Sequence, residues 1–399
     1  MLSTNTLRQF QTPCYIYDTE LLARTLQAIR SELKAHDNYH VHYAIKANSN
    51  PQILQQIATA GLGADCVSGG EIRAALAAGF PAKEIAFAGV GKADWEIQLA
   101  LESGIGMFNV ESFEELEVIN QFATSMNLRA RVSFRINPDV AAHTHSHITT
   151  GRAEDKFGIA KEDMLRAIRT AQQMPHIEFT GLHFHIGSQI LDMKDFRQLC
   201  LCINDLQSNI LDSAGIFAPN INVGGGLGID YEEPDEHPVP DFKAYFDTFK
   251  QHLQLRDGQQ LHFELGRAVV AQMGSLLTRV LYVKHGHQKQ FVIVDAGMTE
   301  LIRPALYGAL HQICNLSGEA RRRSAADPHA EDKTMPVCEY DVVGPICESS
   351  DVFAKDIALP ETFRGDLLVI RSAGAYGETM ASQYNCRALP TAHFINKQP

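Results

Sequence analysis

The chain lacks any apolar run approaching the roughly 18 consecutive residues that a membrane-spanning helix requires. Residues 1–18 carry polar side chains where a secretory signal peptide needs an apolar core, which predicts a cytoplasmic protein. Cysteine is also scarce, with eight residues in 399 and no CxxC pair. The sequence therefore indicates neither a disulfide scaffold nor a cysteine-based zinc site.

Positive charge is in deficit as well, because 35 Lys and Arg face 47 Asp and Glu and leave a net charge of −12. Nucleic-acid binding depends on neutralising phosphates, so a chain with few and scattered basic residues is not expected to bind DNA or RNA. The one dense basic run, residues 321–323, is followed by acidic residues. We expect the polar stretch 315–336 to form an exposed loop.

Eight apolar runs of strand length alternate with helical patterns between residues 39 and 270. Strands joined by helices favour parallel pairing, and eight of them close a (β/α)8 barrel of about 250 residues. An open, doubly wound sheet is the structural alternative. The expected strands are 39–47, 64–68, 85–90, 107–111, 131–137, 180–187, 220–225 and 261–265.

Beyond about residue 275 the pattern changes to short β-rich runs separated by Gly, Pro and Asp, which is typical of a separate β domain. The sequence therefore predicts an α/β protein in three parts. Residues 1–30 are an N-terminal segment that packs with the β domain, residues 31–275 form the barrel, and residues 276–399 form a β domain of barrel or sandwich type.

Barrel enzymes place their reactive groups at the C-terminal ends of the strands. The predicted strand ends in this chain carry a dense set of ionisable residues and glycines that an inert scaffold would not need. These residues are Lys46, Asp65, Glu111, Arg135, His185, Gly224–Gly226, Glu264 and Arg267.

Each member of this set also has a structural interpretation. A lysine that leaves a barrel strand can become nucleophilic when it is desolvated, but Lys46 could equally extend into solvent. Glu264 and Arg267 could simply form an ion pair. The glycine run Gly224–Gly226 could bind an oxyanion through its amides or merely form a tight turn, and it lacks the GxGxxG spacing of a dinucleotide site.

Two histidine clusters raise a metal hypothesis. His143, His145 and His147 alternate, so an extended chain would place their rings on one face. His183 and His185 match the His-x-His pair of metal-dependent barrel hydrolases. A metal site needs three or more convergent ligands, so a metal-dependent hydrolase remains an alternative from another class.

Several motifs follow one another in a single order along nearly the whole chain. With them the sequence resembles the fold-type III pyridoxal-phosphate decarboxylases, which share their fold with ornithine decarboxylase and alanine racemase, and most closely the members that act on diaminopimelate. The motifs are Tyr43-Ala-Ile-Lys46-Ala-Asn48, Asp65-Cys-Val-Ser68-Gly-Gly-Glu71, the segment 143–151 with Lys156-Phe-Gly158, His183-Phe-His185-Ile-Gly-Ser188, Gly224-Gly-Gly-Leu-Gly228, Glu264-Leu-Gly-Arg267, Arg303-Pro-Ala-Leu-Tyr307, Gly344-Pro-Ile-Cys347-Glu348-Ser-Ser-Asp351 and Ala373-Gly-Ala-Tyr376-Gly.

The resemblance implies a bound pyridoxal 5'-phosphate and no metal. Lys46 would hold the cofactor as a Schiff base, and Glu264 would pair with its pyridine nitrogen. His185 would stack on the ring face, which displaces the metal interpretation, and Arg135 would lie near the ring hydroxyl. The implied cofactor-binding residues are Lys46, Asp65, Arg135, His185, Ser188, Gly225, Gly226, Glu264, Arg267 and Tyr376.

The resemblance also implies the reaction, which is decarboxylation of meso-2,6-diaminopimelate to L-lysine and CO2, the last step of lysine biosynthesis by the diaminopimelate pathway. The distal carboxylate would be bound by a guanidinium and the distal amine by the Glu348 carboxylate. Relatives acting on ornithine, lysine or carboxynorspermidine are the nearest alternative, and the ornithine type carries Asp in place of Glu348. The implied substrate-binding residues are Arg267, Arg303, Tyr307, Glu348 and Tyr376.

Cys347 would be the acid that donates a proton to the carbon left after CO2 departs. The resemblance further implies a homodimer in which Cys347 and Glu348 reach the partner's site, with Lys156 and Asp351 as a possible pair across the interface. The sequence departs from the resembled pattern at Leu265 and at residues 378–379. A non-catalytic cofactor-binding protein of the same fold is a further alternative, although it would have little reason to keep Cys347.

Overall fold

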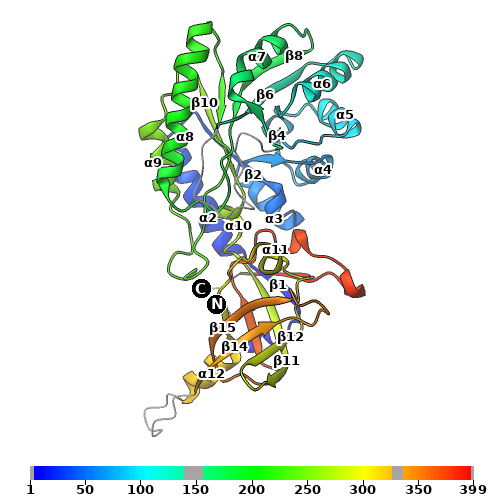
Figure 1. Ribbon diagram of the computed structural model, residues 1–399, viewed down its shortest axis with the longest axis vertical. Coiled ribbons are helices and arrows are strands. Elements are labelled where there is room, and N and C mark those ends of the chain that lie inside the picture. The colour runs from blue at the N-terminus through cyan, green and yellow to red at the C-terminus, as the bar shows by residue number, and fades with distance from the viewer. Residues whose placement is uncertain (1–3, 139–155, 326–335, 397–399) are drawn as a thin grey trace. The chain divides into compact units, whose positions relative to one another are not determined.

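The computed structural model describes residues 4–138, 156–325 and 336–396 (Figure 1). The chain divides into two compact units. The barrel unit comprises residues 25–228 and 240–269, and the β unit comprises residues 1–24, 229–239 and 270–399. The short excursion 229–239 into the β unit was not predicted from the sequence. The histidine triplet at 143, 145 and 147 lies outside the described residues.

Eight parallel strands close the barrel, as the sequence predicted. Each strand pairs in parallel with its neighbours in the order β5-β4-β3-β2-β10-β9-β8-β6, and a pairing between β5 and β6 completes the ring. All eight expected strands are present. They are β2 (Tyr39–Ala44), β3 (Gly63–Cys66), β4 (Ile85–Phe87), β5 (Met107–Val110), β6 (Ala130–Asn137), β8 (Ile177–His183), β9 (Asn220–Asn222) and β10 (Gln260–Leu265), with the short β7 (Ile159–Ala160) added beside β6.

Helices connect these strands and flank them in Figure 1. Their starts follow from local chemistry, because Ser68 and Ser112 each accept a hydrogen bond from a backbone amide in the first turn of the helix that follows. The helices are α2 (Thr19–Leu33), α3 (Pro51–Thr59), α4 (Gly69–Ala77), α5 (Asp94–Ser103), α6 (Phe113–Ser125), α7 (Met164–Gln172), α8 (Met193–Leu206), α9 (Phe242–His252) and α10 (Arg267–Val270).

Polar side chains fill part of the barrel midway along β2 and β10. His42 and His262 are both buried, and Nε2 of His42 lies 2.9 Å from Nδ1 of His262. Glycine makes room for this layer, because a Cβ on Gly63 would come 2.5 Å from Nδ1 of His42, and one on Gly181 would come 2.1 Å from the Asn220 carbonyl oxygen. An apolar core alone therefore does not fill this barrel.

The β unit is built on a mixed sheet in the order β13-β16-β11-β12-β14-β15. Strand β1 pairs antiparallel with β11 and parallel with β17, so segments from both ends of the chain complete one sheet. Its elements are α1 (Thr4–Leu7), β1 (Cys14–Asp18), β11 (Gly274–His285), β12 (Gln290–Val294), α11 (Arg303–Tyr307), β13 (Ile313–Asn315), α12 (Leu316–Ala325), β14 (Val337–Val343), β15 (Val352–Pro360), β16 (Leu367–Ile370) and β17 (Thr391–Ile395).

The structure corrects the loop expected over residues 315–336, because Leu316–Ala325 form helix α12. Leu316 is buried against a cluster that includes Leu277 and Leu367, so the segment contributes to the core of the β unit. Arg321, which the sequence placed in a solvated run, makes two 2.7 Å hydrogen bonds to the Asp366 carboxylate. No helix within the described ranges is long and apolar enough to cross a membrane.

Candidate active site

Lys46 lies directly after β2, in a single 3-10 turn (Ile45–Ala47) whose flanking residues are buried. Its Nζ is 3.6 Å from Oδ2 of Asp65 on the neighbouring strand β3. The lysine side chain is 45% exposed whereas that of Asp65 is 1% exposed, so the amine is accessible to solvent and the carboxyl is buried. Burial and the negative charge of Glu264 raise the pKa of Asp65 to about 8, and Lys46 opposes that rise.

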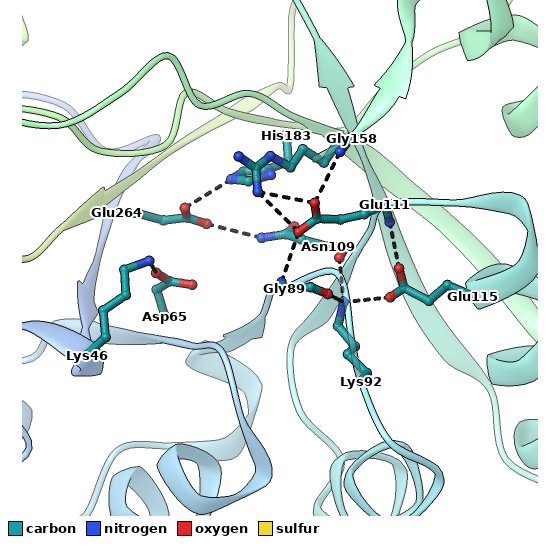
Figure 2. A network of polar contacts seen from close by, with 11 residues as sticks. Lys46, Asp65, Gly89, Lys92, Asn109, Glu111, Glu115, Gly158, His183 and Glu264 are labelled. Carbon is teal, nitrogen blue, oxygen red and sulfur yellow. Dashed lines mark hydrogen bonds and ion pairs between the residues drawn. The ribbon is translucent and has the colours of Figure 1, made fainter. Parts of the chain in front are cut away.

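Glu264, near the end of β10, receives three side-chain hydrogen bonds from three other strands. Figure 2 shows the bonds from Asn109 and His183. Asn109 and Asn222 donate to Oε1 at 3.1 and 2.8 Å, and His183 Nε2 lies 3.0 Å from Oε2. Burial opposes ionisation, but the charge and hydrogen bond of His183, together with the charge of Lys46, outweigh it and hold the pKa of Glu264 below its ordinary value. The site thus contains a desolvated carboxylate that stays anionic.

His183 and His185 have separate partners, although the sequence grouped them as a metal pair. His183 bonds to Glu264, whereas Nδ1 of His185 lies 3.3 Å from the amide nitrogen of Gly225 and accepts its hydrogen. Burial, with the positive charges of Arg135 and Lys46, lowers the pKa of His185 well below its usual value. His185 is therefore a neutral imidazole, and the described ranges contain no group of three or more potential metal-binding side chains.

The glycine loop after β9 is packed closely against the other strand ends. A Cβ on Gly225 would come 1.9 Å from the Glu264 carbonyl oxygen, and Gly224 and Gly226 adopt φ values of +70° and +114°. Only glycine fits this backbone without strain. Gly224 donates its amide to Asn222, so the loop shares a partner with the Glu264 network.

Ser188 and Arg267 lie together in the barrel unit. Nη2 of Arg267 donates a 2.9 Å hydrogen bond to Oγ of Ser188, and the arginine is 6% exposed. The sequence offered an ion pair between Glu264 and Arg267 as the structural interpretation of these two residues. Glu264 instead faces His183 and the two asparagines.

Arg135 is fixed by Glu111, which the sequence placed at a strand end without a specific role. Nη1 of Arg135 donates to both oxygens of Glu111 at 3.1 and 3.2 Å, and Cζ lies 4.6 Å from the centre of the Phe157 ring. Glu111 also accepts the amides of Gly89 and Gly158 at 3.0 and 3.1 Å. The carboxylate therefore ties three chain segments together beside the guanidinium (Figure 2).

A buried lysine supports this network and was missed in the sequence. The Lys92 side chain is 1% exposed, and its Nζ donates to the carbonyls of Gly89 and Asn109 and to Oε1 of Glu115 at 2.8, 2.9 and 2.5 Å. Glu115 in turn accepts the backbone amide of Glu111 at 2.7 Å. Lys92 lies two residues beyond the expected strand 85–90, but its role is identified by its tertiary contacts.

Asn109 and Asn222 were also missed, although a sequence signal existed. Asn109 is the one amide in the short strand β5, and Asn222 ends the short strand β9, which also contains Asn220. Both Asn109 and Asn222 are fully buried. A buried amide requires a hydrogen-bonding partner, so an inward-facing Asn at this level of a barrel points toward another polar group of the interior.

The β unit carries the other predicted residues. Arg303 and Tyr307 lie four residues apart on α11, a spacing that places them on one helix face. Nη1 of Arg303 donates to Nε2 of His311 at 2.9 Å, and Nδ1 of His311 donates to the Arg371 carbonyl at 2.8 Å. Cζ of Arg303 lies 5.0 Å from the centre of the Tyr231 ring. The guanidinium thus contacts an imidazole nitrogen and the face of an aromatic ring in the β unit.

Cys347 and Glu348 are exposed in the turn between β14 and β15. Asp351 shapes this turn, because its carboxylate accepts the amides of Ile346 and Met298 at 2.7 and 2.6 Å and is 3% exposed. The hydroxyl of Tyr384 donates a 2.6 Å hydrogen bond to Oε1 of Glu348. The structure therefore uses Asp351 within its own chain and presents Cys347 and Glu348 outward.

Tyr376 is partly buried, and its φ of +56° is unusual for a residue with a side chain. Close by in sequence, Glu378 accepts a 2.6 Å hydrogen bond from the Tyr17 hydroxyl, which gives this departure from the resembled pattern a partner inside the β unit. Of the residues singled out from the sequence, the barrel unit therefore assembles those proposed for the cofactor ring and its lysine. The β unit holds Arg303, Tyr307, Cys347, Glu348 and Tyr376.

Comparisons with known proteins agree with this geometry. A family model described as the pyridoxal binding domain of pyridoxal-dependent decarboxylases matches residues 20–271. The chain is 60% identical over 386 residues to a diaminopimelate decarboxylase of Bacteroides thetaiotaomicron, covering 97% of this chain and 96% of that protein. It is 41% identical over 385 residues to the diaminopimelate decarboxylase of Zymomonas mobilis, covering 96% and 87%. A crystal structure of Helicobacter pylori diaminopimelate decarboxylase complexed with L-lysine superimposes with a TM-score of 0.88 at 38% identity, covering 99% and 94%.

Proposed function

The chain belongs to the pyridoxal-dependent decarboxylases, and from this premise we propose that it converts meso-2,6-diaminopimelate to L-lysine and CO2. Members of this family are carboxy-lyases that use pyridoxal 5'-phosphate. The observation that carries the proposal is the anionic Glu264 inside the barrel, in a site that also holds the accessible amine of Lys46. The substrate assignment adds the Cys347-Glu348 pair, and relatives with this substrate are similar over nearly the full chain.

The barrel unit fits the cofactor. Oδ1 of Asp65 and Nδ1 of His183 are buried and make no hydrogen bond to any described residue. Two polar atoms of the barrel can therefore form hydrogen bonds to a bound ligand. The neutral ring of His185 suits a place against an aromatic face. The bound group supplies an electron sink for the electrons released when CO2 leaves.

The residues of this chain would divide the work as follows. Lys46 provides the amine that holds the cofactor and then yields it to the substrate. Glu264, kept ionised, favours a proton on the ring nitrogen. Arg135, Ser188, Gly225, Gly226 and Tyr376 complete cofactor binding in the proposal, with Asp65, His185 and Arg267.

Recognition of the far end of the substrate falls to the β unit. Arg303 and Tyr307 would hold the distal carboxylate, because a guanidinium binds a carboxylate through two parallel N–H groups and Tyr307 lies on the same face of α11. Glu348 would bind the distal ammonium. Cys347, exposed in the same turn, would hold and deliver the proton that replaces CO2.

We further propose that the enzyme works as a homodimer in which Cys347 and Glu348 serve the partner's barrel. Their exposure in a turn built by Asp351 supports this assignment, since such residues are presented to whatever lies outside the chain. Lys156 is exposed, whereas Asp351 is buried and accepts two amides of its own chain, so an inter-subunit contact between them would require this turn to rearrange.

The proposal is tested by product analysis. The purified chain is incubated with pyridoxal phosphate and, separately, meso-diaminopimelate, ornithine, lysine or arginine, and products are identified by mass spectrometry. Lysine formed from diaminopimelate alone is the expected result. A polyamine formed from ornithine or lysine instead would keep the mechanism and overturn the substrate.

A further inference from the structure

The two asparagines that contact Glu264 have no role in the mechanism above. Both reach the same oxygen, Oε1, but from different parts of the barrel, since β9 pairs with β10 whereas β5 does not. Both are fully buried, and Glu264 is 8% exposed. Burying these three groups costs free energy, because two amides and a carboxylate have all lost their contacts with water.

The orientation of the Asn222 amide is fixed independently of Glu264. Its Oδ1 accepts the Gly224 amide at 2.9 Å, so its Nδ2 must face the carboxylate. The same orientation holds for Asn109, because a reversed amide would place its oxygen against an anion. Both side chains therefore act as donors to Glu264.

The number of acceptor positions on Glu264 is limited. Each carboxylate oxygen has two lone pairs, and both lone pairs of Oε1 accept hydrogen bonds from the asparagines. One lone pair of Oε2 accepts the hydrogen bond from His183. One acceptor position remains, and it is on Oε2.

We propose that Asn109 and Asn222 are positioning residues that saturate Oε1 of Glu264, keep the carboxylate anionic and leave Oε2 as the atom that meets the protonated ring nitrogen of the cofactor. The inference rests on the cofactor role of Glu264 in the proposed function. Neutral donors achieve this without a competing charge, whereas a lysine or arginine at either position would neutralise the carboxylate that the ring nitrogen needs.

Replacement of either asparagine tests this assignment through cofactor affinity, with Asn109→Ala and Asn222→Ala measured separately. Equilibrium dialysis of the full chain against pyridoxal phosphate between pH 5 and 9 gives the dissociation constant without any substrate. Each variant should weaken binding roughly 10-fold or more, as expected for a lost hydrogen bond to a buried charge. The acid-side loss of binding should move to higher pH, because Glu264 then takes up a proton more readily.

Asn220→Ala is the matched control. Asn220 lies on the same strand two residues earlier and is also buried, but it bonds to the Thr180 carbonyl and to His262 rather than to Glu264. The cofactor affinity of Asn220→Ala should stay within about threefold of the parent value, since no hydrogen bond to the Glu264 carboxylate is lost. Equal effects in Asn220→Ala and Asn222→Ala would assign the asparagines a purely structural role and overturn the proposal.

Two further variants cover a failure to fold. If thermal denaturation shows that Asn222→Ala is unfolded, Asn109→Ser and Asn222→Asp replace it. The added acid in Asn222→Asp should weaken cofactor binding more than Asn109→Ser does, because it sets a like charge against Glu264. Unchanged affinity in both would refute the assignment. Normal cofactor binding without lysine formation in the parent chain would overturn the proposed reaction and leave this inference standing.

Discussion

Nζ of Lys46 lies 3.6 Å from Oδ2 of Asp65 at the C-terminal ends of β2 and β3, and the two side chains differ sharply in exposure. The lysine faces solvent while the carboxyl is buried near a second buried carboxylate, Glu264. The charge of Lys46 acts on both acids, and that of Arg135 adds to it at Asp65, but burial and the charge of Glu264 outweigh these two cations at Asp65. This imbalance makes the charge of Asp65 sensitive to pH.

Asp65→Asn should stabilise the cofactor-free chain more at pH 8 than at pH 5. The pKa of Asp65 is raised to about 8 by burial and by Glu264, so the folded state keeps a proton that the unfolded state releases near pH 4. Stability contributed by this group is therefore lost as pH rises between those values, by at most about 1.4 kcal/mol per pH unit. Urea denaturation at pH 5 and 8 measures the difference. Asp257→Asn, at an exposed loop residue, is the control, and a pH-independent difference for Asp65→Asn would contradict the assignment.

Lys46→Ala and Cys347→Ala should fail at different stages. Lys46→Ala should carry no cofactor after borohydride reduction, as judged by intact mass, whereas Cys347→Ala should carry it normally. Lysine formation in Cys347→Ala should fall by roughly 10²–10⁴, the usual cost of losing a general acid. Wild-type turnover in Cys347→Ala would remove Cys347 from this role.

Mixing these two variants tests the shared site. If Cys347 serves the partner's barrel, exchanged heterodimers regain one complete site, and activity should return to about a quarter of the parent value. Activity is compared before and after subunit exchange at equal total protein. No recovery, with exchange demonstrated by native mass spectrometry, would place Cys347 and Lys46 of one chain at the same site.

Gly225→Ala should abolish cofactor binding and lower the melting temperature. The added Cβ would come 1.9 Å from the Glu264 carbonyl oxygen, which forces β10 or the glycine loop to move. Gly91→Ala is the matched control, since its Cβ would meet no atom within 4 Å. Cofactor titration and thermal denaturation compare the two, and equal behaviour would show that the loop is not tightly constrained.

The paired histidines should make the chain acid-sensitive. Burial lowers the pKa values of His42 and His262, which lie next to His40 and within the field of Glu264. Both rings are neutral when folded but take up protons below about pH 6.5 when unfolded, so stability should fall as the pH drops below that value. His262→Gln should reduce the loss of unfolding free energy between pH 7 and 5, whereas His287→Gln, at an exposed position, should not. Parallel pH profiles in all three proteins would exclude this source of acid sensitivity.

Tyr384→Phe should impair recognition of the substrate's distal end. Tyr384 donates to Glu348 from a strained segment, in which Asn385 and Cys386 have φ values of +55° and +58°. Because both side chains are exposed, the expected effect is modest, a roughly 3- to 10-fold rise in KM with kcat nearly unchanged. Tyr282→Phe, at an exposed position on β11, is the control. An unchanged KM would show that Glu348 needs no such support.

The order of strands and helices was determined by the sequence itself. All eight barrel strands were expected within a few residues of their observed bounds, because apolar runs of strand length alternate with helical periodicity. Lys46, Asp65, Arg135 and Glu264 were found by their place at strand ends, since parallel strands gather such ends on one rim. The family motifs then supplied their proposed roles.

Only the tertiary structure determined which side chains contact one another. Helix α12 was mistaken for a loop because its polar composition hides the few positions that pack, such as Leu316. Asn109, Asn222 and His183 come from three different strands and meet at one carboxylate only when the barrel closes. The local sequence determines the hydrophobic periodicity and the helix caps. A buried polar group, in contrast, requires a hydrogen-bonding partner, and that partner is often distant in sequence. Only the folded chain brings the two together.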